Sequence, residues 1–237
     1  MSSTRAVARV ALVVLVTDPR YQLAITCDAL RDAAKALGGH RVLVQLRDKE
    51  ADVVSLLATA LALRAATREV GAQLVINGPL ALALAGQVAA DGIHLPGRTS
   101  AGEMASARAA AHEVLGRSAI VTVAAHDDEG VRNATLARVS AVLVSPVFET
   151  PGKGPARGVD ALRAARAIVD AARHAPPLHV VALGGIAATN AAACIEAGAD
   201  GVAAIRALYE GVERTELLRA LDSIGRAAPV AGCRDEC

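Results

Sequence analysis

Three polar residues that could bind an anion follow one of the apolar runs of the chain. Gln45, Arg47 and Lys49 alternate in the segment VQLRDKE. Alternation places all three on the same side of an extended segment. An amide and two cations in that arrangement can clamp a phosphate or a pyrophosphate. The other interpretation is a solvated strand end, and both stay open at this point.

A pair of glycines could bind a phosphate through the backbone. Gly184 and Gly185 follow the apolar run HVVAL. Paired glycines allow close backbone approach and can direct N–H groups at an anion, although a tight turn before a helix would look the same. The next apolar run ends at Ile205 and Arg206. Arg206 either adds positive charge to that site or faces solvent at the start of a helix.

Two histidines and an asparagine also stand where apolar runs end. His126 occurs in AAHDDEG, His94 in GIHLP and Asn77 in LVING. A histidine titrates near neutrality and is the usual proton-transfer residue, so His126 is our candidate for chemistry. The alternative is a helix-start histidine neutralised by the two aspartates that follow it.

A loop rich in glycine and proline, residues 145–158, carries Thr150, Lys153 and Arg157. It is long for a connection inside a compact domain, and such loops are often lids or binding loops. A mobile surface loop is the other possibility.

Regular elements must position these residues. Short β-branched runs alternate with longer Ala/Leu/Arg runs of helical character along the whole chain. This pattern predicts eight strand–helix units. The strands are expected at Val7–Thr17, His40–Leu46, Gln73–Asn77, Gly92–Leu95, Ala119–Val123, Ala141–Val144, His179–Leu183 and Gly201–Ile205. The helices are expected at Leu23–Leu37, Asp52–Val70, Leu80–Ala89, Ala101–Leu115, Asp128–Ala137, Val159–Arg173, Thr189–Ala197 and Thr215–Gly225.

Near-continuous apolar strands indicate a parallel sheet that is covered on both faces. Eight units within 237 residues predict an α/β fold of one domain, a (β/α)8 TIM barrel over residues 1–228. A doubly wound sheet competes with this prediction, but the segment VLVTDPRYQ lacks its glycine-rich fingerprint. Residues 229–237 are expected to be a tail outside the barrel. In such barrels the active site lies at the carboxyl ends of the strands, where the candidate residues fall.

Composition excludes several classes of protein. The apolar fraction is 53% and the mean hydropathy +0.38, which excludes a disordered chain. The net charge of +1 and a single Phe, with no Trp, argue against a nucleic-acid binder. No run reaches the length of a membrane helix and no cleavage site follows the first apolar run, so we expect a cytoplasmic protein without membrane contact. Cys233 and Cys237 in the tail have no evident metal or disulfide role.

Six motifs in order carry a family resemblance: QLRDK, ING, DGIHLP, AAHDDEG, SPVFETPGKG followed by RG, and ALGGI. Together they resemble the thiamine phosphate synthase superfamily, including its thiazole tautomerase (TenI-like) branch. The resemblance runs from about Thr17 to Ile205 and implies a (β/α)8 barrel. It also implies a small-molecule thiazole phosphate as substrate, with a pyrimidine pyrophosphate as a second one in the synthases. Members of the family are often homodimers, and we expect one here.

The two branches make different demands on the residues. A synthase of this family holds Mg²⁺ with two aspartates, but Gly78 and Thr99 stand at those positions here. Mg²⁺ prefers carboxylate oxygens, so no metal site is expected, and Mg²⁺ would be a cofactor only in a synthase. Gln45, Arg47 and Lys49 nevertheless match the pyrophosphate clamp of the synthases. Thr150 and Lys153 match their strand-six loop, in which Gly152 replaces a second threonine.

The tautomerase branch needs one acid/base group and a phosphate anchor, with no metal. His126 matches its histidine, and the ING, HLP and FET forms are more similar to this branch. The resemblance therefore favours a tautomerase, in which His126 moves the proton and Gly184, Gly185, Ile205 and Arg206 hold the phosphate. Substrate contacts are expected from Asn77, His94, Arg47 and Lys153. A thiamine phosphate synthase is the alternative, and a non-catalytic phosphate-ligand binder is the second one.

Overall fold

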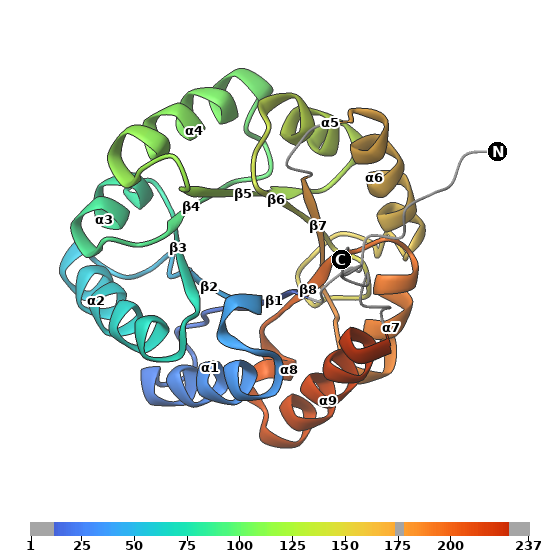
Figure 1. Cartoon of the computed structure of the whole chain (residues 1–237), viewed down its shortest axis with the longest axis horizontal. Helices are drawn as coiled ribbons and strands as arrows, with labels where there is room; N and C mark the ends of the chain where they lie inside the picture. The colour runs from blue at the N-terminus through green and yellow to red at the C-terminus, as the bar shows by residue number, and fades with distance from the viewer. Residues whose placement is uncertain (1–11, 174–177, 228–237) are drawn as a thin grey trace, which may run out of the picture.

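Eight parallel strands close into a barrel in which each strand pairs with its neighbours in the sequence and β8 pairs with β1. This computed structural model describes residues 12–173 and 178–227. Helices form a ring around the barrel, as the view down its axis shows (Figure 1). The predicted (β/α)8 barrel is thus confirmed.

The strands are β1 (Leu12–Val16), β2 (Val42–Leu46), β3 (Gln73–Asn77), β4 (Gly92–Leu95), β5 (Ile120–Ala125), β6 (Ala141–Val144), β7 (His179–Leu183) and β8 (Gly201–Ala204). The helices are α1 (Leu23–Leu37), α2 (Val53–Val70), α3 (Ala81–Val88), α4 (Ala101–Leu115), α5 (Asp128–Ala137), α6 (Asp160–Ala171), α7 (Ala188–Glu196), α8 (Arg206–Tyr209) and α9 (Gly211–Ala227). A 3-10 turn, η1 (Gly39–Arg41), precedes β2.

Several boundaries differ from the sequence-based prediction by one or two residues, and three differences are informative. The segment predicted as strand His40–Leu46 opens with η1, because Gly38 turns with a φ of +88°. Strand β5 runs on to Ala125, since Ala124 and Ala125 pair with β6 although alanine is a weak strand former. The last helix begins earlier than predicted and is preceded by the short α8. The tail prediction, with Cys233 and Cys237, lies outside the described residues, as does the start of the first predicted strand.

Alternation along the strands gives the barrel two separate apolar clusters. One face of each strand packs on the helices in the larger cluster. The smaller cluster fills the interior and comes from β1, β6, β7 and β8: Val14, Val16, Ala141, Leu143, Val181 and Ala203. On β2, β4 and β5 the corresponding alternate positions include three buried polar residues, Gln45, His94 and Thr122. The interior is therefore apolar on one side and polar on the other.

A repeated device holds the amino ends of the strands. Asp91, Ser140 and Asp200 stand directly before β4, β6 and β8. Their side chains accept hydrogen bonds from the backbone N–H groups of Leu74 at 2.8 Å, Val121 at 3.0 Å and Val180 at 2.8 Å, respectively. Each donor is the second residue of the preceding strand. The base of the barrel thus repeats one hydrogen-bonding pattern at three of its strand pairs.

Candidate functional site

The three residues of the predicted anion clamp at the end of β2, Gln45, Arg47 and Lys49, become more exposed from the first to the last. Gln45 is only 3% exposed, and its Oε1 atom has no hydrogen-bond partner among the described residues. Arg47 is half-buried, and its backbone exchanges hydrogen bonds with the Thr17 hydroxyl, at 2.7 and 3.0 Å. Lys49 is exposed. Buried polar atoms are nearly always hydrogen-bonded, so the unpartnered Oε1 atom of Gln45 marks this side chain as a candidate ligand contact.

His94 lies in the barrel interior between Asn77 on β3 and Thr122 on β5, with which it is in register. Its Nδ1 atom is 2.8 Å from the Thr122 Oγ1 atom. Burial, together with the nearby Arg47, lowers the pKa of His94 to about 4. The imidazole is therefore neutral near neutral pH. Asn77 is half-buried at the end of β3.

His126 follows β5 and is held by the ends of β4 and β6. Its Nδ1 atom lies 3.0 Å from the backbone oxygen of Ser145. A carbonyl only accepts, so Nδ1 carries the proton and Nε2 of the neutral ring is free to accept one. The ring packs on Gly97, where an added Cβ would lie 2.9 Å from Nε2. Asp127 does not pair with His126; its carboxylate caps α5 by accepting from the Gly130 N–H at 2.7 Å.

The predicted binding loop, residues 145–158, folds over the glycine pair. The N–H groups of Val147 and Phe148 donate to the oxygens of Leu183 and Gly184, at 2.9 and 3.0 Å. Gly184 and Gly185 have φ values of +102° and +63°. A Cβ on Gly185 would lie 2.7 Å from the Phe148 Cβ atom. The glycines therefore serve the packing of this loop, and a phosphate contact at them stays a prediction.

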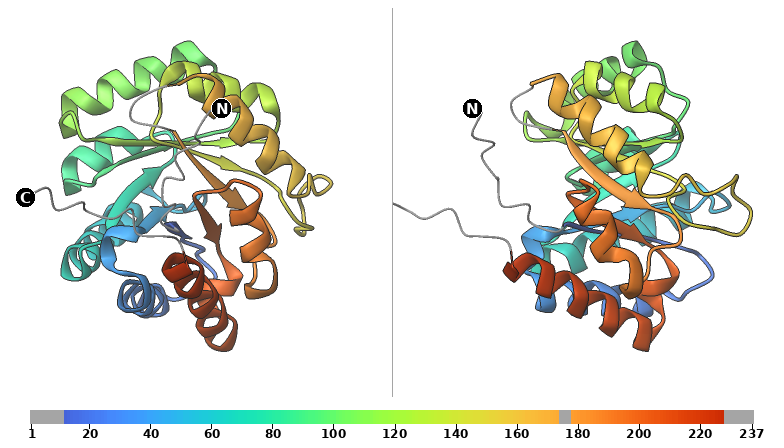
Figure 2. Two further views of the ribbon diagram at one scale, coloured as in Figure 1. Left: turned by 45° about the vertical axis from the view of Figure 1, so that its right-hand side comes forward. Right: turned by 90° about the vertical axis from the view of Figure 1, so that its right-hand side faces the viewer.

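The same loop carries the predicted Thr150 and Lys153. It extends beyond the barrel at the end toward which the strands point, as the right-hand view of Figure 2 shows. Thr150 donates to the Phe148 oxygen at 3.0 Å, whereas Lys153 is exposed. Arg157 bonds Asp128 at 2.9 Å, and its buried Nη1 atom has no partner among the described residues. The loop thus presents cations to the carboxyl end of the barrel.

The two predicted residues after β8, Ile205 and Arg206, have different surroundings. Ile205 is half-buried and packs against the interior cluster. The Arg206 side chain is 71% exposed and lies 3.9 Å from Glu213 of α9. Of the two interpretations of Arg206, the structure favours the solvent-facing one. A role in holding phosphate stays a prediction for both residues.

The residues at the expected metal positions do not fit Mg²⁺. Gly78 has a φ of +123°, a conformation that an aspartate rarely adopts. Thr99 turns its hydroxyl onto the Pro96 oxygen at 2.7 Å. The part of the chain that the structure describes holds no group of three or more His, Cys, Asp or Glu side chains suited to a metal. Neither Gly78 nor Thr99 supplies the carboxylate oxygens that Mg²⁺ prefers.

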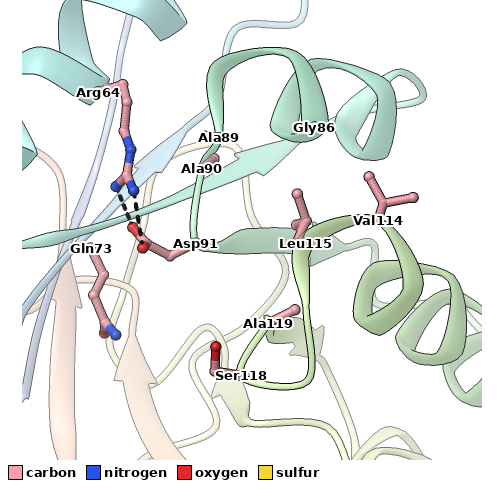
Figure 3. A pocket seen from close by; sticks show the side chains of 10 residues that line it. All are labelled: Arg64, Gln73, Gly86, Ala89, Ala90, Asp91, Val114, Leu115, Ser118 and Ala119. Atoms are coloured by element: carbon pink, nitrogen blue, oxygen red, sulfur yellow. Dashed lines mark hydrogen bonds and ion pairs between the residues drawn. The ribbon is translucent and has the colours of Figure 1, made fainter.

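A cavity of about 340 Å³ lies at the opposite end of the barrel, between α2, α3, α4 and the starts of β4 and β5. Figure 3 shows its charged wall, where Arg64 faces Asp91. These two side chains are 2.7 Å apart. Asp91 also holds the Leu74 N–H, so this wall belongs to the repeated pattern at the base. The cavity is remote from His94 and His126 and contains none of the predicted site residues.

The fold and the residues at the strand ends together define a structural class of protein. It is a (β/α)8 barrel with polar, partly unpartnered side chains at the carboxyl ends of its strands, where barrel enzymes act. None of the described helices is both long and apolar enough to cross a membrane.

Comparison with known proteins gives the family. The family model described as thiamine monophosphate synthase matches residues 13–208, and the chain belongs to this family of thiamine-biosynthesis enzymes. A protein of Geobacter sulfurreducens named putative thiamine-phosphate synthase is 37% identical over 82% of this chain and 85% of its own length. A thiamine-phosphate synthase of Moorella thermoacetica is 34% identical over 80% and 84%. Thiamine phosphate pyrophosphorylase from Pyrococcus furiosus shares the fold, with a TM-score of 0.71, 23% identity, and coverage of 92% of this chain and 98% of that one.

The structure adds residues that the sequence did not point to. Thr122 contacts His94, the Ser145 backbone orients His126, and Gly97 leaves room for its ring. The partners of the two histidines lie 28 and 19 positions away in the chain. Register between neighbouring strands was the only signal that could have paired them.

Proposed function

We propose that this enzyme joins a pyrimidine pyrophosphate to a thiazole phosphate and releases pyrophosphate. The observation that carries the proposal is the β2 strand end, where the buried Gln45 side chain stands below the cations Arg47 and Lys49. The names of the curated relatives support the same reaction. In a tautomerase, by contrast, no pyrophosphate needs to be bound.

The chain supplies positive charge where the leaving group would separate. As the carbon–oxygen bond to pyrophosphate breaks, the bonding electrons leave with the pyrophosphate, which gains negative charge. Arg47 and Lys49 at the end of β2, with Lys153 from the loop over the barrel, are the cations of the predicted site. Fixed cations at the place where charge develops stabilise the transition state. Gln45 can add a hydrogen bond beneath them through its amide nitrogen, because a pyrophosphate oxygen only accepts.

Metal takes no part in this proposal, because the residues at positions 78 and 99 do not fit Mg²⁺. In this mechanism Arg47, Lys49 and Lys153 supply the positive charge in its place. We therefore expect pyrophosphate release to persist in excess chelator, with loss of about 10²-fold in Arg47→Gln, the size of effect seen when one charge-stabilising donor is removed.

A specific observation favours a second candidate, the thiazole tautomerase. The free Nε2 atom of His126, set by the bond from Nδ1 to the Ser145 oxygen, suits a group that takes up and returns a proton. Such a reaction needs no metal, which agrees with Gly78 and Thr99. On this hypothesis His126→Gln leaves binding nearly intact and lowers the rate by about 10²-fold or more.

One assay separates the candidates. The full chain is given the pyrimidine pyrophosphate and the thiazole phosphate, with Mg²⁺ or with chelator, and pyrophosphate and thiamine phosphate are quantified. A parallel reaction with the unaromatised thiazole carboxylate phosphate follows aromatisation by ultraviolet absorbance. Pyrophosphate and thiamine phosphate in equal amounts establish the synthase.

Three other outcomes overturn the proposed reaction or its metal-free mechanism. Aromatisation without pyrophosphate release establishes the tautomerase. Release that requires Mg²⁺ keeps the reaction and refutes the metal-free mechanism. Binding of both phosphates by folded protein without turnover leaves a phosphate-ligand binder. Lys35→Gln, on the outer helix α1, is the control for loss of one positive charge far from the strand ends.

A further inference from the structure

The contact between Thr122 and His94 is buried, and no role in binding or catalysis has so far been given to Thr122. The Thr122 Oγ1 and His94 Nδ1 atoms are 2.8 Å apart. Thr122 is 1% exposed and His94 5% exposed. The two residues face each other in register on the adjacent strands β4 and β5. Both side chains are therefore fixed by the barrel itself.

The surroundings of Thr122 favour its hydroxyl as the donor of this hydrogen bond. Among the hydrogen bonds between described residues, its only partner is His94 Nδ1. A buried hydroxyl hydrogen without an acceptor is costly, so it points at Nδ1, which then carries a lone pair and no proton. Because His94 is neutral near neutral pH, its single ring proton stands on Nε2.

The Nε2–H group of His94 in turn makes no hydrogen bond to a described residue. It belongs to the polar half of the barrel interior, and the charge of Arg47 is felt at His94. A hydrogen-bond donor on a largely buried side chain near a cation favours an acceptor that carries negative charge. His126 is held the other way round, with the proton on Nδ1 and Nε2 free.

We infer that Thr122 is a positioning residue that locks His94 as a neutral Nε2–H donor to an anionic oxygen of the ligand. This inference rests on the proposed function for the identity of the ligand, a pyrophosphate ester. The strand-end site thus contains two histidines in opposite tautomers, one presenting a donor and one an acceptor. The donor needs no ionised imidazole, which the buried position disfavours.

The tautomer can be observed without any substrate. In ¹⁵N-labelled full-length protein near neutral pH, long-range ¹H–¹⁵N spectra distinguish the protonated ring nitrogen from the bare one. His94→Gln identifies its resonances. We expect the proton on Nε2 of His94 and on Nδ1 of His126. A His94 proton on Nδ1 overturns the inference, whatever reaction the enzyme catalyses.

The role in binding is tested with inorganic pyrophosphate as the probe, by calorimetry. Thr122→Val keeps the shape of the side chain and removes the hydroxyl, and Thr122→Ser restores it. We expect about tenfold weaker binding in Thr122→Val and recovery in Thr122→Ser, as for loss of one hydrogen bond to a charged group. Equal affinity of folded Thr122→Val and wild type overturns the inference.

Failure of the inference and failure of the proposed function remain distinguishable. The spectra and the binding isotherms report on Thr122 and His94 without turnover. Absence of pyrophosphate release in the assay above refutes the synthase reaction while both measurements on Thr122 still give their answer. If Thr122→Val does not fold, Thr122→Ser and the wild-type spectra decide the inference by the position of the His94 proton.

Discussion

The packing of His126 on Gly97 gives the sharpest test of the site geometry. An added Cβ at position 97 would lie 2.8 Å from His126 Cδ2, 2.9 Å from Nε2 and 3.1 Å from the Ala124 oxygen. Ordinary contacts begin near 3.4 Å, so in Gly97→Ala the ring must retreat by about half an ångström. The bond of 3.0 Å from Nδ1 to the Ser145 oxygen must then change in length or angle.

The expected cost of Gly97→Ala divides between stability and activity. Overpacking of this size costs about 1–3 kcal/mol of unfolding free energy. Misplacement of a site residue by a fraction of an ångström is expected to lower turnover by about tenfold to 10²-fold. Denaturant unfolding measures the first effect, and the assay of pyrophosphate release and aromatisation measures the second. The His126 ring resonances report the displacement directly.

Gly102→Ala is the matched control for this prediction. Gly102 also follows β4, lies in α4, and would place its Cβ in open space. Alanine inside a helix is expected to raise stability by about 0.5–1 kcal/mol and to leave turnover unchanged. Gly97→Ala with wild-type turnover and unshifted His126 resonances would refute the packing argument.

Three further predictions concern charge and burial. His94 has a pKa of about 4 in the folded state against an ordinary value of 6.5, so unfolded chains bind its proton first as the pH falls. About 3 kcal/mol of unfolding free energy is therefore lost between pH 6.5 and pH 4. Measured by denaturant unfolding at both pH values, this loss should be greater in the wild type than in His94→Gln by that amount. An equal loss in the two proteins would contradict the prediction. Asp91→Ala leaves the Arg64 guanidinium and the Leu74 N–H without their carboxylate partner, so about 3 kcal/mol of unfolding free energy should be lost. The control, Asp160→Ala at an exposed ion pair, should lose less than about 0.5 kcal/mol. Equal losses for the two variants in urea unfolding would refute the prediction. Arg47→Gln should weaken pyrophosphate binding by about tenfold or more and lower its salt dependence, and an unchanged calorimetric isotherm would remove Arg47 from the site.

Much of the fold could be predicted from the sequence because its elements are short and regular. Helical spacing alone placed Leu23–Leu37, Ala101–Leu115 and Asp128–Ala137 with the bounds that the structure has. The predicted end of β5 was wrong, because the local sequence pattern there opposes the pairing of this strand with β6. Alanines at the end of β5 have low strand propensity, and only the ladder with β6 keeps them extended.

The site was predictable in place but not in orientation. Strand ends such as Gln45 and His94 could be located by alternation, since the barrel fixes where strands end. Which nitrogen of His94 carries a proton depends on Thr122, in a different strand of the sheet. The predicted role of Gly184 and Gly185 was likewise incomplete, because it depends on a distant part of the chain. Its φ values accommodate the loop over residues 145–158, which no local pattern near Gly184 reveals.

The two ends of this barrel use polar groups in opposite ways. At the base, the carboxylates of Asp91 and Asp200 are satisfied by backbone N–H groups and by arginines, so they stabilise the closed sheet. At the other end, the buried Gln45 Oε1 atom has no partner among the described residues, which costs stability unless a bound ligand donates a hydrogen bond to it. Strong bonding at the base can offset that cost. Ligand binding should therefore raise the melting temperature of the wild type more than that of a variant whose polar interior is already reduced, such as His94→Gln.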